Sequence, residues 1–152
     1  MKIKRVQIEN FRSIKSVDLN LMSYMVFVGK NNSGKSNLMK AIDVFFNDSV
    51  EFNDFRKEKG KKIDQLSIII HFSQLNEAEK ELYKGKLISE GEENEFLVLR
   101  YTANLSKDNG FKLSSKYEYL TKSLQLESEA AKNRFGGFTD DDLYSKKSNI
   151  EN

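Results

Sequence analysis

The sequence has no cysteine, no tryptophan, no proline and a single histidine among its 152 residues. Without cysteine, the chain can form no disulfide, perform no thiol catalysis and build no cysteine metal site. A zinc site at His71 is disfavoured as well, because no second histidine or cysteine is present to share the metal. Phenylalanine and tyrosine supply most of the large apolar bulk.

Long apolar runs and a strong net charge are also lacking. No stretch approaches the length needed to cross a membrane, and the N-terminus has no apolar signal core. These features predict a cytoplasmic protein without membrane partners. The net charge of +2 does not by itself indicate a nucleic-acid partner.

The most informative stretch is residues 29–36, which read Gly-Lys-Asn-Asn-Ser-Gly-Lys-Ser. This is the G-x-x-x-x-G-K-S pattern of a phosphate-binding loop, or Walker A motif. Gly29 and Gly34 allow a tight backbone turn close to phosphate oxygens. The backbone amides from Asn31 to Ser36 can then form an anion-binding nest.

Two side chains of the loop have expected roles of their own. Lys35 would place its ammonium against the β- and γ-phosphates of a nucleotide. Ser36 would donate its hydroxyl oxygen to Mg²⁺, and it is the one predicted metal ligand. The residues predicted to bind the nucleotide within this motif are Gly29, Asn31, Asn32, Ser33, Gly34, Lys35, Ser36 and Asn37.

The flanks of the loop fit the same interpretation. Residues 24–28 form an apolar run that predicts a buried central strand before the loop. Residues 36–46 predict a helix with one apolar stripe, formed by Leu38, Met39, Ala41, Ile42, Phe45 and Phe46. A strand, a loop and a helix are the context that the motif requires. The competing interpretation is a chance Gly/Ser/Asn surface loop before an ordinary helix.

Alternation of apolar and polar residues predicts the remaining elements. Two strands, at residues 2–9 and 17–21, would form a hairpin before the loop. Residues 47–62 are predicted to be a loop, whose lysines are either a contact for DNA phosphates or simply solvated. These lysines are Lys57, Lys59, Lys61 and Lys62.

The second half of the chain is predicted to hold more strands and short helices. Strands are expected at residues 66–72, 96–101 and 111–120, with a hairpin turn at 108–110. Asn76 and Glu79 form a capping box for a helix with Ala78 and Leu82 inside. Residues 122–135 could be a second helix before a polar tail. Tyr117 and Tyr119 could stack on bases, although cross-strand packing is the favoured interpretation.

The stretch from Ile3 to Ile42 resembles the N-terminus of SMC- and RecF-like ABC ATPases. The resemblance is carried by Ile8-Glu9-Asn10-Phe11-Arg12-Ser13, by the loop continued through Asn37-Leu38, and by Ala41-Ile42. Within that group, the sequence is most similar to overcoming-lysogenization-defect (OLD) family ATP-dependent endonucleases and related bacterial defence ATPases. The resemblance covers about the first third of the chain.

The resemblance implies an α/β fold, namely a P-loop NTPase of the ABC-ATPase-head type with a mixed sheet. It implies binding of Mg²⁺ and ATP, head-to-head assembly as a homodimer or a larger complex, and an Arg12 that approaches the nucleotide. DNA is a partner by resemblance alone. We expect a single N-terminal ATPase domain over residues 1–152, with strands, loop and helix in 1–46 and further strands and helices in 47–152.

The sequence departs from the family pattern after the loop. The strand expected at 66–72 ends in His71 and Phe72, and the strand at 96–101 runs into Arg100. Neither supplies the acidic pair, the Walker B acids, that holds the Mg²⁺ shell and activates water in such ATPases. No signature motif and no C-terminal nuclease site is recognisable, and Asp140-Asp141-Asp142 is more typical of a solvated turn.

The catalytic residues are therefore unknown, and the sequence predicts an incomplete head, the N-terminal lobe. Nucleotide would bind, and hydrolysis would require residues or a partner that this chain does not supply. Two alternatives remain. One is a non-catalytic module in which nucleotide only controls assembly. The other is a phosphate-loop small-molecule kinase, which would need mobile lid arginines, and Arg100 and Arg134 are its only candidates.

Overall fold

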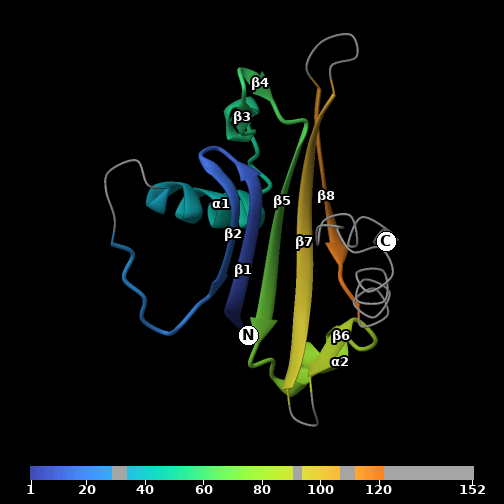
Figure 1. The fold of residues 1–152 in the computed structure, drawn as a ribbon. Coiled ribbons are helices and arrows are strands. Elements are labelled where there is room, and N and C mark those ends of the chain that lie inside the picture. Colours follow the sequence, from blue (N-terminus) through green and yellow to red (C-terminus); the bar gives the residue numbers. More distant parts are fainter. Residues whose placement is uncertain (29–33, 91–93, 107–111, 122–152) are drawn as a thin grey trace, which may run out of the picture. The chain divides into compact units, whose positions relative to one another are not determined.

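The computed structural model describes residues 1–28, 34–90, 94–106 and 112–121 (Figure 1). The described part is mixed α/β with a mostly antiparallel sheet, as expected for the predicted fold class. Its strands are β1 (Lys2–Phe11), β2 (Ile14–Asn20), β3 (Lys57–Glu58), β4 (Lys61–Lys62), β5 (Gln65–Ser73), β6 (Leu87–Glu90), β7 (Asn94–Ser106) and β8 (Lys112–Tyr119). Its helices are α1 (Lys35–Asn47), the 3-10 turn η1 (Phe52–Asp54) and α2 (Glu77–Leu82).

The main sheet has six strands in the order β2-β1-β5-β7-β6, with β8 also paired to β7. By its contacts the chain divides into two compact units. One comprises Lys4–Ile70 and Arg100–Tyr117, and we call it the loop unit because it contains the phosphate-binding motif. The other comprises Met1–Ile3, His71–Leu99 and Glu118–Asn152. Each unit is considered by itself below.

The hairpin predicted before the loop is confirmed. β1 and β2 pair antiparallel, with Ile8 opposite Val17 and Phe11 opposite Ile14. Val6, Ile8 and Phe11 are fully buried, which explains the alternating pattern that predicted the strand. The strand runs two residues further than predicted, to Phe11, and the reversal is a tight turn at Arg12 and Ser13.

The helix after the loop is confirmed as α1, but its buried face is rotated from the predicted stripe. Phe45 is 3% exposed, whereas Phe46 is 55% exposed and Met39 is 60% exposed. The helix buries Leu38, Ala41, Val44 and Phe45. These positions follow the spacing of three and four residues that one helix face requires, so the predicted stripe was too wide.

The prediction of a strand at residues 24–28 is wrong. These residues have no regular secondary structure, and within the described ranges no strand pairs with them. Tyr24, Val26 and Val28 are 95%, 84% and 91% exposed. We call residues 22–28 the exposed segment. Its apolar composition predicted burial, but the described residues provide no neighbouring strand to cover it.

The C-terminal end of α1 is fixed to β7 and β8 within the loop unit. Asp48 adopts a left-handed conformation at the helix end and accepts hydrogen bonds from the Tyr101 hydroxyl at 2.8 Å and the Ser115 hydroxyl at 2.7 Å. The Tyr117 hydroxyl donates to the carbonyl oxygen of Phe45. Burial raises the pKa of Tyr101, and its bond to Asp48 raises it further. The packing role favoured for Tyr117 is thus confirmed.

Residues 47–62 are more regular than the predicted loop. They contain η1 and a small hairpin of β3 and β4, in which Lys57 lies opposite Lys62. The Lys62 ammonium lies 3.9 Å from the centre of the Phe52 ring. Burial lowers the pKa of Lys62, and the nearby charge of Lys57 lowers it further. Lys57, Lys59 and Lys61 are exposed. Exposure fits solvated lysines as well as it fits lysines that contact DNA phosphates.

The second unit confirms the capping box but not the helix face expected behind it. The Asn76 side chain accepts from the Glu79 amide, and the Glu79 carboxylate accepts from the Asn76 amide, both at 2.8 Å. The six-residue helix α2 buries none of its side chains. Ala78 is exposed and Leu82 is 73% exposed, so the inner face predicted for them is wrong. The Tyr119 ring lies 6.2 Å from the ring of Tyr83 at the end of α2, so it packs against a helix end and not against a neighbouring strand.

Several predictions fall outside the described residues and stay predictions. They concern the turn at 108–110, the helix at 122–135 and the acidic run at 140–142. The single domain over residues 1–152 is likewise untested. In the described part of the chain, neither helix is long and apolar enough to span a membrane.

The rotated face of α1 can be tested with two adjacent phenylalanines. We expect Phe45→Ala to lower the free energy of unfolding by about 3–5 kcal/mol, because it opens a cavity in the core. Phe46→Ala removes the same atoms from a mostly exposed site and should cost no more than about 1 kcal/mol. Urea unfolding of the two variants measures both. Equal losses would contradict the helix phase seen here.

The exposed segment offers a second matched pair. Val28→Ala should change the free energy of unfolding by no more than about 0.5 kcal/mol, because this side chain lies in solvent. Val44→Ala makes the same change at a fully buried site and should cost about 2 kcal/mol. Thermal and urea unfolding of both variants provide the comparison. A loss at Val28 as large as that at Val44 would mean that the segment is buried in solution.

Candidate functional site

The described end of the phosphate-loop motif lies at the N-terminus of α1. Gly34 has φ 92° and precedes the helix, and its carbonyl oxygen accepts the first helical hydrogen bond from the Leu38 amide at 3.0 Å. A side chain is strained at this left-handed φ, so glycine suits the position. Because glycine has no side chain, the N-cap residue Gly34 gives α1 no side-chain cap.

That uncapped start suits an anion. The first amides of a helix have no partner within the helix, and the helix dipole makes this end positive. α1 has 13 residues and no acidic residue in its first turn, so nothing in that turn neutralises the positive end. Lys35 is half-buried and Ser36 is exposed in the same turn. These donors fit a phosphate group, and the Ser36 hydroxyl fits a Mg²⁺ bound to it.

The predicted nucleotide residues divide into two sets in the structure. Gly34, Lys35, Ser36 and Asn37 are described and lie together at the start of α1. Gly29, Asn31, Asn32 and Ser33 lie outside the described residues, and their roles stay predictions. The proposed contacts of all eight residues with a nucleotide are untested.

Arg12 lies in the turn between β1 and β2, where it pairs with a buried acid. Its Nε donates to the Asp54 carboxylate at 2.8 Å, and its backbone amide donates to the Asp54 carbonyl oxygen at 2.7 Å. The Arg12 side chain is 34% exposed, whereas that of Asp54 is fully buried. The guanidinium is therefore held in place through one edge by Asp54. Its predicted contact with a nucleotide remains a prediction.

The turn that carries Arg12 lies against the phosphate-loop end. The next residue, Ser13, accepts a hydrogen bond at its Oγ from the Asn37 side chain at 2.8 Å. Asn37 lies in the first turn of α1, two residues after Lys35. The structure thus brings together two stretches that carried the family resemblance, the Asn-Phe-Arg-Ser turn and the start of the helix.

Sequence reasoning missed Asp54. The sequence predicted a loop over residues 47–62, and an acidic residue in a loop is normally solvated. The one signal was that Asp54 lies between Phe52 and Phe55, because a polar residue flanked by aromatics in a short span indicates partial burial. Phe55 is 2% exposed and forms an isolated bridge with Phe11, which carries Asp54 into the interior.

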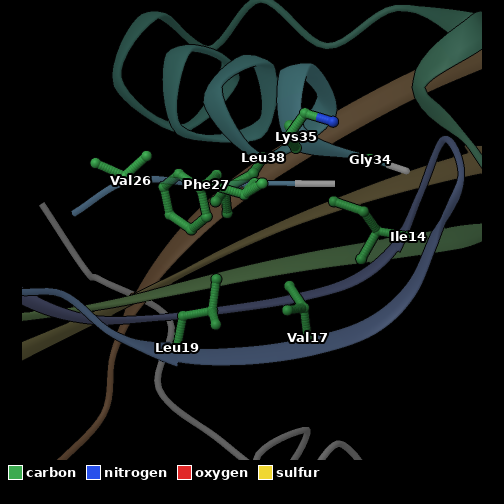
Figure 2. A pocket seen from close by; sticks show the side chains of 9 residues that line it. Ile14, Val17, Leu19, Val26, Phe27, Gly34, Lys35 and Leu38 are labelled. Atoms are coloured by element: carbon green, nitrogen blue, oxygen red, sulfur yellow. The ribbon is translucent and has the colours of Figure 1, made fainter. Parts of the chain in front are cut away.

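A hollow of about 450 Å³ lies beside this site in the loop unit (Figure 2). Its lining is mostly apolar and comprises Ile14, Val17, Leu19, Val26, Phe27, Val28, Gly34, Lys35 and Leu38. In Figure 2, Val17 and Leu19 point toward Phe27, while the Lys35 ammonium points away from them. Most of these walls are apolar and would give a phosphate no hydrogen bond, and of the lining residues only Gly34 and Lys35 belong to the phosphate-loop motif.

The candidate lid arginine of the kinase alternative does not have the required position. Arg100 is 3% exposed and lies within β7, so it cannot move over a substrate as a lid side chain must. Arg134, the other candidate, lies outside the described residues. The structure therefore gives this alternative no support.

Comparison with known proteins agrees with the motif. The AAA ATPase domain family matches residues 1–152. An uncharacterized protein of Methanocaldococcus jannaschii is 30% identical over 138 residues, which cover 81% of this chain and 41% of that protein. An OLD nuclease of Thermus scotoductus is 39% identical over 46 residues, which cover 30% of this chain and 9% of the nuclease.

This chain spans about two fifths of the archaeal relative and about a tenth of the nuclease. The likeness to the nuclease is therefore a partial one, although it agrees with the resemblance to SMC- and RecF-like ATPases of the OLD type. The family match covers every residue, including the loop, the turn before it and the helix after it. The chain belongs to the AAA ATPase domain family.

Proposed function

We propose that this chain is the ATP-binding N-terminal portion of an OLD- or RecF-like ABC-type ATPase. ATP would bind at Gly29–Ser36, with Lys35 on the β- and γ-phosphates and Ser36 on Mg²⁺. The observation that carries the proposal is the start of α1, where left-handed Gly34 leads into an uncapped helix end with Lys35 and Ser36 in its first turn. Membership of an ATPase family supports the same ligand.

Hydrolysis would require groups outside the described site. Phosphoryl transfer to water needs a residue that positions the water and acids that hold the metal ion. The two strands considered for them end in other residues, since β5 closes with His71, Phe72 and Ser73 and β7 runs through Arg100. We infer that the acids come from further sequence or from a partner.

The biological role is proposed from relatives. The resemblance to the OLD family suggests a role in DNA processing or anti-phage defence in the cytoplasm, and the name of the Thermus scotoductus relative, OLD nuclease, supports the link to a nuclease. Assembly through ATPase heads, as a homodimer or a larger complex, would supply the missing acids. Exposed apolar patches commonly mark protein-binding surfaces, and the exposed segment lies next to the loop. DNA is the proposed nucleic-acid partner.

Loss of one lysine tests the nucleotide site. We expect Lys35→Ala to weaken Mg-ATP binding by at least about tenfold, because a charged contact to phosphate is lost. Lys40→Ala is the matched control: it removes the same charge from the same helix, but Lys40 pairs with Asp43 at 2.9 Å. Isothermal titration calorimetry with ATP measures both.

The contradicting result is equal binding by the wild-type chain and Lys35→Ala, or equal losses in the two lysine variants.

The same titration with and without Mg²⁺ examines the metal role of Ser36. Ser36→Ala should retain the metal-independent part of the affinity and lose the part that Mg²⁺ adds, because the hydroxyl ligand is gone.

The isolated chain should bind ATP and turn it over no faster than buffer does. The physical reason is that β5 and β7, the two strands considered for them, do not end in the acids that would hold the metal ion and position water. Phosphate release at saturating Mg-ATP measures this. Turnover that disappears in Lys35→Ala would show that the chain contains its own catalytic acids and would overturn this part of the proposal.

A further inference from the structure

The turn between β1 and β2 has an unusual backbone. Asn10 and Arg12 have φ values of 56° and 49°, both in the left-handed region. Asparagine adopts this conformation readily, but arginine does so only when its surroundings enforce it. The sequence of this turn therefore does not determine its shape, and the enforcing contacts must come from elsewhere in the loop unit.

Those contacts come from Asp54, the last residue of η1, and from Arg56, two residues later. The Arg12 amide donates to the Asp54 carbonyl oxygen at 2.7 Å, and the Arg56 amide donates to the Asn10 carbonyl oxygen at 3.0 Å. The Asp54 carboxylate also accepts the Glu51 amide at 2.8 Å, so both of its oxygens are used in holding this arrangement. A buried carboxylate with such partners resists displacement, because any movement would leave a charge unpaired.

Ser13 is held from the same side. The Arg56 guanidinium donates to the Ser13 carbonyl oxygen at 2.9 Å, which fixes the backbone of this residue. Its side chain faces the phosphate-loop end, where Oγ accepts from Asn37 Nδ2 at 2.8 Å. The same Oγ would lie 3.5 Å from a Cβ placed on Gly34, so the Ser13 side chain bonds to Asn37 and also lies close to Gly34.

We propose that Ser13 is a positioning residue for the nucleotide site and that it acts through Asn37. The chain of contacts runs from buried Asp54 through the strained turn to Ser13 and then to the first turn of α1. The Ser13–Asn37 bond fixes this turn in the orientation that phosphate requires before the ligand arrives. A pre-oriented site binds more tightly because less motion is lost on binding. This inference rests on the proposed nucleotide binding.

A double-mutant cycle tests the coupling. Ser13→Ala and Asn37→Ala should each weaken Mg-ATP binding about two- to tenfold, the range of one hydrogen bond. The double variant should be no weaker than the poorer single variant, because both changes remove the same bond. Ser13→Thr keeps the hydroxyl and should restore wild-type affinity.

A merely structural role would give a different pattern. Ser13 is exposed and Asn37 is half-buried, so positioning predicts melting temperatures within about 2 °C of wild type for both variants. Single variants that bind ATP as the wild type does, or losses that multiply in the double variant, would overturn the inference. So would a loss of affinity that Ser13→Thr fails to restore.

Failure of this inference is distinguishable from failure of the proposed function. If Lys35→Ala abolishes binding and the cycle shows no coupling, the site binds nucleotide and Ser13 does not position it. If the wild-type chain does not bind Mg-ATP, the proposed function fails and the inference fails with it. Lys40→Ala serves as the control in both experiments, because its side chain pairs with Asp43 instead of the turn.

Discussion

The site depends on how both ends of α1 are fixed within the loop unit. At its start, Ser13 accepts the Asn37 side chain, and left-handed Gly34 leaves the first amides without a side-chain cap. At its end, Asp48 accepts hydrogen bonds from the hydroxyl groups of Tyr101 on β7 and Ser115 on β8. Phe45 packs between these ends against the ring of Tyr117 at 5.6 Å. A helix fixed in this way presents its positive end in one direction, which an anion-binding site requires.

The exposed segment, unlike α1, is not packed against the rest of the loop unit along its length. It leads into the phosphate loop, yet Val26 and Val28 lie in solvent and the hollow beside them is lined by apolar side chains. Apolar surface of this kind normally lies against other protein. This chain covers 41% and 9% of its longer relatives. In our proposal, further strands or a partner subunit would cover the apolar side chains of the exposed segment. A head completed in that way would also acquire the acids that hydrolysis requires.

The sequence predicted the elements that local pattern determines. Alternation found β1, β2 and β5, the capping box found α2, and the phosphate-loop spacing found the start of α1. It failed where burial depends on distant partners. Residues 24–28 have the composition of a buried strand, but composition does not show whether a neighbouring strand is present. Phe45 and Phe46 are adjacent and equally apolar, so only the packing of α1 shows which one is buried.

The candidate site was also predictable only where a local sequence pattern determines it. Gly34, Lys35 and Ser36 belong to a motif whose spacing carries its own physical meaning. Asp54 belongs to no motif and lies 42 residues from the arginine that it holds. Its role arises from tertiary contacts of Phe55 with Phe11, which no local pattern reports. The Ser13–Asn37 bond likewise joins two stretches that only the fold brings together.

The most direct measurement is a titration of the ¹⁵N-labelled chain with Mg-ATP, followed by the NMR signals of its backbone amides. We expect the amides of Gly34 to Asn37 to shift most, because the phosphates accept hydrogen bonds at the start of α1. The Ser13 amide should follow through Asn37, and the exposed β3–β4 hairpin should remain unchanged. Saturable shifts confined to that hairpin or to the second unit, with none at Gly34 to Asn37, would show that ATP does not bind at the start of α1.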